Sequence, residues 1–124
     1  MNDEKLEQAI FQILRMTHLG EIKWVRRSAP RNLGIGTDSV FSSYFETEYM
    51  GQRLALYQQR FRFFSIEIEA ERWSERVILA LLTDDGELQF EFPQSSQVHD
   101  LFETVQYKTS NVDGFLQNLL NSKS

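Results

Sequence analysis

The sequence predicts an α+β protein in which an antiparallel sheet of about four or five strands packs against one N-terminal helix and two C-terminal helices. Two observations support this fold class. Apolar residues with helical spacing occur at the two ends of the chain, and apolar residues with strand-like alternation fill its middle. Because helical and strand-like stretches are segregated along the chain, we expect antiparallel hairpins covered by helices.

The composition is that of one globular domain. The chain has 124 residues, of which 41% are hydrophobic and 13% aromatic, enough to bury one core. We therefore expect a single domain spanning residues 1–124. No run of about twenty apolar residues could span a bilayer. The N-terminus, MNDEKLEQ, is acidic and polar where a signal peptide would be basic and then apolar, so we expect a cytoplasmic protein.

The absence of cysteine and the net charge exclude several functions. Without cysteine the chain has no disulfide, no thiolate nucleophile and no cysteine-ligated metal centre. The formal net charge of −5 argues against general nucleic-acid binding, which depends on Lys and Arg at the phosphates. Basic residues are nevertheless enriched in the middle of the chain, where residues 23–76 hold nine Lys and Arg against seven acids.

The stretch Val77–Phe92, VILALLTDDGELQFEF, predicts the central hairpin of the sheet. Its Asp-Asp-Gly sequence at 84–86 suits a three-residue turn that ends in a left-handed glycine, which would place Thr83 opposite Glu87. The first strand is apolar at every position, so we expect it to lie inside the sheet with both faces at least partly covered. Pro93 ends the second strand because it lacks an N–H donor.

This turn fixes which side chains share a face of the hairpin. In the favoured register one face carries Ile78, Ala80, Leu82, Leu88, Phe90 and Phe92. A two-residue turn at Asp85-Gly86 would shift the pairing by one residue and place Leu79 and Leu81 with the phenylalanines instead. The three-residue turn is preferred because the shorter one pairs Thr83 with Leu88.

The N-terminal part of the chain predicts a helix, a strand and a loop. Asn2 or Asp3 can cap a helix whose apolar residues recur every three or four positions, and Gly20 suits its end. Glu21–Arg27, EIKWVRR, alternates as a strand does. Ser28–Asp38 collects glycine, proline and short polar residues, so we expect the longest and most mobile internal loop there.

A second hairpin is predicted from Val40–Tyr49 and Arg53–Arg62, with its turn at Gly51. The apolar residues of its second strand change face twice along the sequence. This change favours a bulge or break near Gln58-Gln59 or Phe63-Phe64.

The C-terminal part predicts a polar connector at Glu69–Arg76 and, after Pro93, two helices. The first should run from about Gln97 to Tyr107, and the second begins near Val112. Both helices are expected to pack their apolar residues inward. The predicted core contains Ile10, Ile13, Leu14, Trp24, Leu54, Leu56, Ile78, Ala80, Leu82, Phe90, Phe92, Leu101, Val105, Phe115 and Leu119.

No stretch of the sequence carries a motif specific to one chemistry. The two histidines, His18 and His99, have no recognisable nucleophile or carboxylate partner. The acids around Asp84 are explained by turn chemistry, without the longer ligand pattern of a calcium loop. Gly34-Ile35-Gly36 lacks the third glycine and the following helix of a phosphate-binding turn. We therefore predict no cofactor, no metal site and no enzymatic activity.

The leading hypothesis is a non-enzymatic interaction module that forms a homodimer or binds a protein partner. The edge of an open sheet must be covered, blunted or used, and the second hairpin offers exposed aromatic and flexible apolar residues there. The candidate interaction residues are Tyr44, Phe45, Tyr49 and Met50. In the alternative, helices of the same chain cover these residues.

Two further hypotheses belong to other functional classes. Arg26, Arg27 and Arg31, beside the predicted loop, could hold a small anionic ligand or a nucleic acid, although a solvated loop explains them as well. The third hypothesis is an enzyme with unrecognised acid and base residues, in which a deep pocket holds His18 or His99 against a carboxylate.

Overall fold

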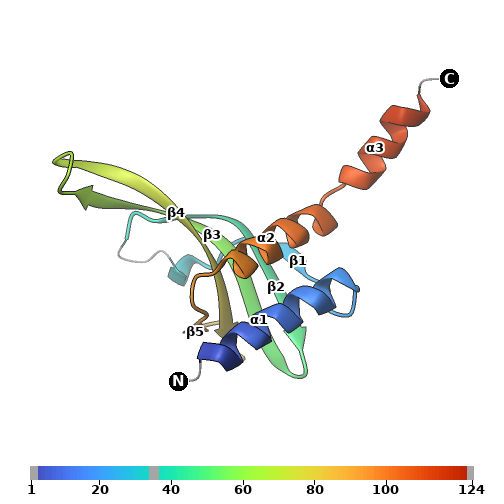
Figure 1. Cartoon of the computed structure of the whole chain (residues 1–124), viewed down its shortest axis with the longest axis horizontal. Coiled ribbons are helices and arrows are strands. Elements are labelled where there is room, and N and C mark those ends of the chain that lie inside the picture. The colour runs from blue at the N-terminus through green and yellow to red at the C-terminus, as the bar shows by residue number, and fades with distance from the viewer. Residues whose placement is uncertain (1–2, 34–36, 123–124) are drawn as a thin grey trace.

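A computed structural model describes residues 3–33 and 37–122 and confirms the α+β fold (Figure 1). The chain begins with helix α1 and ends with helices α2 and α3, and the strands lie between them. The elements are α1 (Asp3–His18), β1 (Val25–Arg27), the 3-10 helix η1 (Arg31–Leu33), β2 (Val40–Tyr49), β3 (Gln52–Ser65), β4 (Ala70–Leu82), β5 (Leu88–Glu91), α2 (Ser96–Thr109) and α3 (Val112–Asn121).

The five strands form one antiparallel sheet in which each strand pairs with the next along the chain, in the order β1-β2-β3-β4-β5. Strands β3 and β4 are the longest, with 14 and 13 residues. Beyond the pair of Arg60 and Glu75, residues 61–65 of β3 and 70–74 of β4 extend past the other strands as a two-stranded arm, on the left of Figure 1. β4 includes the predicted polar connector, which is therefore part of the sheet.

Helices α1 and α2 lie side by side on one face of the sheet (Figure 1). Ser95 caps α2, since its hydroxyl accepts a hydrogen bond from the Val98 N–H at 3.3 Å. The stripe of α2 predicted to face inward is buried. The main core under these helices contains Ile10, Met16, Ile22, Trp24, Phe45, Leu54, Leu56, Val77, Leu79, Phe92, Val98, Leu101, Phe102 and Val105.

The opposite face of the sheet has a smaller core, which the segment between β1 and β2 helps to cover. Its buried residues are Tyr44, Ala55, Tyr57, Ile78, Ala80 and Leu82. Ala29 and Leu33 pack against them from the segment predicted as a mobile loop, so part of that segment is anchored to the sheet. Gly34-Ile35-Gly36 lies outside the described residues. The two covered faces explain why the middle of β4 is apolar at every position.

The turn of the central hairpin is as predicted, but the register beyond it is not. The Thr83 N–H donates to the Glu87 carbonyl at 2.8 Å, and Gly86 has a φ of 85°. Leu82 then pairs with Leu88 while Leu81 pairs with Phe90, which makes the intervening residue of β5 a bulge.

The bulge changes which side chains of β4 and β5 share a face of the sheet. Leu79 and Leu81 share the helix-covered face with Phe90 and Phe92, and Ile78, Ala80 and Leu82 lie on the other face. The predicted face assignment was therefore wrong. The latter three residues are nevertheless buried, because the chain covers the second face too.

The predicted break in β3 was also wrong. β3 pairs with β4 without interruption from Arg53↔Leu82 to Ser65↔Ala70, and the irregularity lies in β2, where Ser43 has a φ of 51°. The change of apolar phase in β3 needs no bulge, since Phe63 and Phe64 lie in the arm, where both faces are exposed to solvent. The turn at Gly51 is as predicted.

Leu79→Ala should lower the free energy of unfolding by about 2–5 kcal/mol, because Leu79 is fully buried between the sheet and the helices. Leu88→Ala, at a half-exposed position near the turn, should change it by less than about 1 kcal/mol. Urea denaturation of both variants measures the two values. Equal losses would contradict the observed register.

Stability should fall at alkaline pH because of the buried tyrosines. Burial raises the pKa of Tyr57 to about 12, and burial with the nearby Glu46 carboxylate also raises the pKa of Tyr44. A tyrosine ionises near pH 10 in the unfolded chain. The neutral form that the fold favours therefore stabilises fully below about pH 10, and this contribution is lost as pH rises toward about 12.

Tyr57→Phe removes one of these two ionisations. Between about pH 9 and pH 11 the variant should lose about 1 kcal/mol less unfolding free energy than the parent protein. Denaturant titrations at several pH values provide the comparison. Identical pH profiles would show that Tyr57 ionises as readily in the folded chain as in the unfolded one.

Candidate functional site

Two of the four predicted interaction residues are unavailable to a partner. Tyr44 is 2% exposed and stacks on Tyr57, with ring centroids 5.5 Å apart. Phe45 is fully buried against Phe102 of α2. Consecutive residues of β2 face opposite sides of the sheet, and the same chain covers both sides. This is a correction to the predicted interaction surface. For Phe45 it matches the alternative in which helices of the same chain cover these residues, whereas Tyr44 lies in the core on the other face, where Ala29 and Leu33 pack.

The other two predicted residues, Tyr49 and Met50, lie at the turn between β2 and β3. Met50 is 88% exposed and Tyr49 is partly exposed. Their turn is short, and Gln52 and Arg53, which follow it, make hydrogen bonds within the sheet. These two side chains alone form a small surface.

The three predicted anion-binding arginines do not form one cluster. Arg26 lines a groove on the helix side of β1, where its guanidinium lies over the Phe45 ring. Arg27 lines a different depression, which also contains the acids Glu46 and Glu48. Arg31 is exposed in η1. Neighbouring positions on a strand point to opposite faces, which separates Arg26 from Arg27.

The aromatic and basic residues interleaved along β3 are engaged within the arm. Arg60 and Arg62 both lie over the Trp73 ring, with the guanidinium carbons 5.3 and 5.5 Å from its centroid. Arg60 also pairs with Glu75 at 3.2 Å, and Arg62 with Glu71 at 3.3 Å. Carboxylates therefore occupy the guanidinium groups that a nucleic-acid phosphate would need.

Both histidines are exposed side chains. The Nε2 atom of His18 is 3.4 Å from the Thr104 hydroxyl in a shallow depression that also includes Glu103, and His99 is exposed. Within residues 3–33 and 37–122, no three His, Asp or Glu side chains gather closely enough to hold a metal ion. No helix in this part of the chain is both long and apolar enough to cross a membrane.

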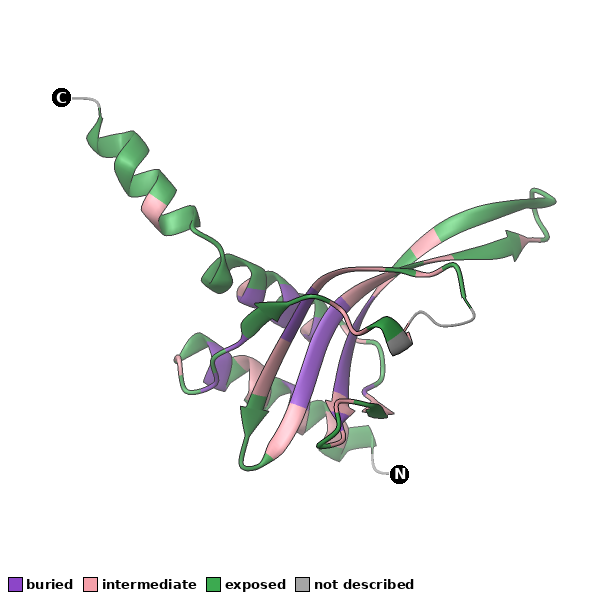
Figure 2. Cartoon of the chain, turned by 180° about the vertical axis from the view of Figure 1, so that it is seen from behind, coloured by how far each residue is buried: buried purple, intermediate pink, exposed green. Residues whose placement is uncertain are grey.

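The largest departure from the sequence prediction is α3, which forms as expected but is not buried against any other described helix or strand. It projects from the end of α2, away from the sheet, and Figure 2 shows it exposed along most of its length. Phe115 and Leu119, both predicted core residues, are 60% and 49% exposed. No residue of the helix is buried. The prediction that α3 packs inward was therefore wrong.

The exposed apolar residues of α3 lie on one side of the helix. They are Val112, Phe115, Leu116, Leu119 and Leu120, spaced at intervals of three and four. This spacing gives one continuous apolar stripe along the helix. The opposite side is polar, and Asp113 is the only charged residue between Val112 and Asn121.

Hydrogen bonds at the junction between α2 and α3 hold α3 in its outward direction. The Ser110 N–H caps the end of α2 by donating to the Gln106 carbonyl at 3.1 Å. The Ser110 hydroxyl then accepts from the Val112 N–H at 3.3 Å. The Tyr107 hydroxyl donates to the Asp113 carboxylate, across the junction. The exposed position of α3 is therefore supported by specific contacts.

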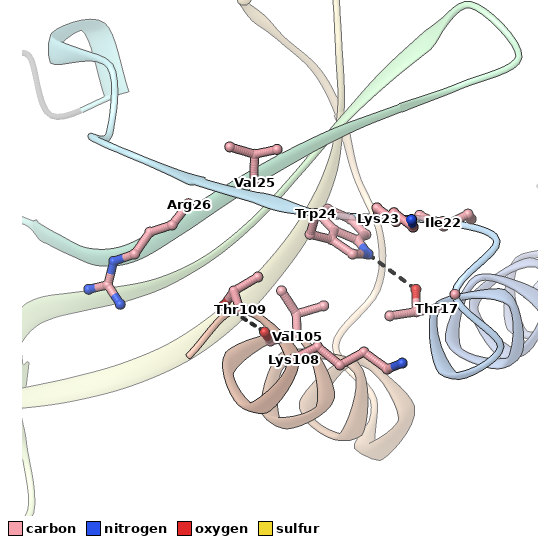
Figure 3. Close-up of a pocket in the computed structure, with 10 residues that line it drawn as sticks. Thr17, Ile22, Lys23, Trp24, Val25, Arg26, Val105, Lys108 and Thr109 are labelled. Carbon is pink, nitrogen blue, oxygen red and sulfur yellow. Dashed lines mark hydrogen bonds between the residues drawn. The ribbon is translucent and has the colours of Figure 1, made fainter. Parts of the chain in front are cut away.

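A groove lies at the end of α2, three residues before α3 begins. It has a volume of about 510 Å³ and lies between β1 and the ends of α1 and α2 (Figure 3). Ile22, Trp24 and Val105 supply its apolar surface, and the Trp24 Nε1 atom donates to the Thr17 hydroxyl at 3.1 Å. The charged residues that line it are Lys23, Arg26 and Lys108, and none of the lining residues is acidic.

The sequence indicated these features only in part. The apolar stripe of α3 is visible in the sequence, but the same stripe also fits a helix packed on its own sheet. The groove combines residues from both ends of the chain, such as Thr17 and Thr109, and no local spacing signals it.

Comparisons with known proteins give no relative: no family model, no curated protein and no solved structure matches the chain. Only the geometry of the chain itself therefore bears on its function.

Thr17→Val should lower the free energy of unfolding by about 1–3 kcal/mol, because it leaves the buried Trp24 N–H without an acceptor. The same substitution in a Trp24→Phe background should cost less, since no N–H then needs a partner. Thermal and urea denaturation of the parent protein, the two single variants and the double variant give the coupling free energy between Thr17 and Trp24. Equal costs in both backgrounds would show that the hydrogen bond contributes nothing.

Proposed function

We propose that this protein is a non-enzymatic interaction module that self-associates through α3. The observation that carries the proposal is the apolar stripe of this helix, from Val112 to Leu120, which no other part of the described chain covers. A small domain rarely leaves such a stripe in water unless another molecule covers it.

The length of α3 supports a binding role. Isolated helices shorter than about 12–15 residues are marginally stable in water, and α3 has 10 residues. It contains Gly114, which lowers helix stability, and Asn111 makes no side-chain capping bond. Because α3 has no tertiary packing of its own, burial against another molecule is the main stabilisation open to it.

A second copy of the chain is the occupant that these features favour. The stripe has no charged residue that would select a partner of opposite charge, since Asp113 lies off it. Two identical apolar stripes are complementary to each other, and pairing about a twofold axis gives a closed dimer. α3 carries one charged side chain, Asp113, so pairing of α3 brings few like charges together.

α3 is a better candidate than the other exposed apolar region, the end of the arm. Phe63 and Phe64 are exposed there, but they pair with Arg72 and Glu71 and point to opposite faces. Ile66 and Ile68, at the tip, flank Glu67. The apolar residues of the arm are therefore divided by direction and by charge, whereas those of α3 form one stripe.

Three further hypotheses remain predictions from the sequence. They are an anionic-ligand or nucleic-acid binder, an enzyme with unrecognised acid and base residues, and a cytoplasmic location. Only the self-association hypothesis is supported by a surface that the chain itself leaves uncovered.

Sedimentation of the protein over a wide concentration range tests the proposal. We expect a reversible dimer with a dissociation constant on the order of micromolar, as for interfaces of small area. Phe115→Ser with Leu119→Ser should be monomeric at every concentration. Its melting temperature, measured at a concentration where both proteins are monomeric, should be close to that of the parent, because neither side chain is buried within one chain.

Met50→Ser with Ile66→Ser is the matched control, since it removes two exposed apolar side chains from other places on the surface. This variant should dimerise as the parent does. A parent protein that stays monomeric at all concentrations overturns the proposal. Recovery of a different protein bound to α3, with no dimer, would replace the second copy with that partner.

A further inference from the structure

We infer that the dimer is antiparallel and that the C-terminal end of each α3 lies over the groove of the other copy. This inference rests on the proposed self-association, and it names the surface that receives the helix. The groove is the one lined by Trp24, Val105 and Thr109, at the end of α2 (Figure 3).

Connectivity places the groove where an antiparallel partner would end. Lys108 and Thr109 line it, and α3 begins three residues later at Val112. A helix of this length is about 15 Å long. When two such helices pair antiparallel about a twofold axis, the last turn of one lies beside the first turn of the other. Leu120 of one copy therefore comes to the groove of its partner.

The two halves of the stripe then have different contacts. Phe115 and Leu116, in the middle of α3, meet their equivalents across the twofold axis. Leu119 and Leu120, near the end, lie against the groove, beside the Trp24 ring and Thr109.

The charges on the two surfaces are complementary in this arrangement. The C-terminal end of a helix carries a partial negative charge, and α3 has no basic residue in its last turn to offset it. The groove carries Lys23, Arg26 and Lys108 without an acid among its lining residues. The Lys108 Nζ atom donates to the His18 carbonyl at 3.0 Å, on the side of the groove that adjoins the depression with Glu103 and Asp113. A parallel pair would instead bring two negative helix ends together.

The exposed apolar area of α3 also favours use of the groove. The exposed parts of the five apolar residues of α3 amount to roughly 500 Å² per copy, taking about 200 Å² for each when fully exposed. A standard stable interface buries about 800 Å² per partner. Contact between the two helices alone falls short of that area. Docking onto the groove adds surface from β1 and α2, and the twofold axis makes this contact occur twice.

Cysteine cross-linking tests the arrangement, because the chain has no cysteine of its own. Leu120→Cys and Thr109→Cys are made as separate variants that carry tags of different size. They are mixed, equilibrated and mildly oxidised, and the products are separated by mass. Asn121→Cys mixed with Thr109→Cys is the matched control, since residue 121 lies beside residue 120 but on the polar side of α3.

We expect the mixture of Leu120→Cys and Thr109→Cys to give mainly the mixed cross-linked dimer, at least about fivefold above the yield of the Asn121→Cys control. Strong cross-linking of Leu120→Cys to itself, without the mixed product, indicates a parallel pair and overturns this inference while leaving self-association in place. A dimer in sedimentation that gives neither product overturns it as well. Absence of any dimer in sedimentation is the separate result that removes the proposed function.

Discussion

The structure depends on one constraint, the burial of both faces of β4. Its residues from Val77 to Leu82 are apolar throughout, and alternate side chains of a strand point to opposite faces. Each buried large apolar side chain contributes about 1.5–3 kcal/mol, so neither face can be left in water. Helices α1 and α2 cover one face, and the segment containing Leu33, together with the tyrosines of β2 and β3, covers the other.

This arrangement leaves α3 without a place in its own chain. The helix-covered face of the sheet is occupied by α1 and α2, which also pack against each other. The hydrogen bonds around Ser110 direct α3 away from the sheet. The helix thus has the apolar stripe of a buried helix, but no other part of the described chain packs against that stripe. An intermolecular contact resolves this conflict without changing the fold.

The sequence predicted some parts of the candidate site and missed others. The stripe of α3 follows from helical spacing, which is a local property of the chain. The exposure of the stripe does not follow from this spacing, because Phe115 would show the same spacing if it were packed against the sheet. Tyr44 and Phe45 were predicted on an exposed edge, since the sequence does not show that both sides of β2 are covered. The groove beside Trp24 forms only when folding brings Thr17 and Val105 together, because these residues are far apart in the sequence.

The sequence by itself determined the fold class, the order of the helices and strands, and the three-residue turn at Asp84-Asp85-Gly86. These features depend on residues close together in the chain: apolar spacing, capping groups, and a glycine that adopts a positive φ. Only the tertiary structure decided the bulge in β5, the face on which Leu79 and Leu81 lie, and the outward direction of α3. Each of these features depends on which distant segments pack together. The extra residue in β5 is tolerated because both faces of the sheet are covered, and the direction of α3 depends on α1 and α2 already occupying the helix-covered face.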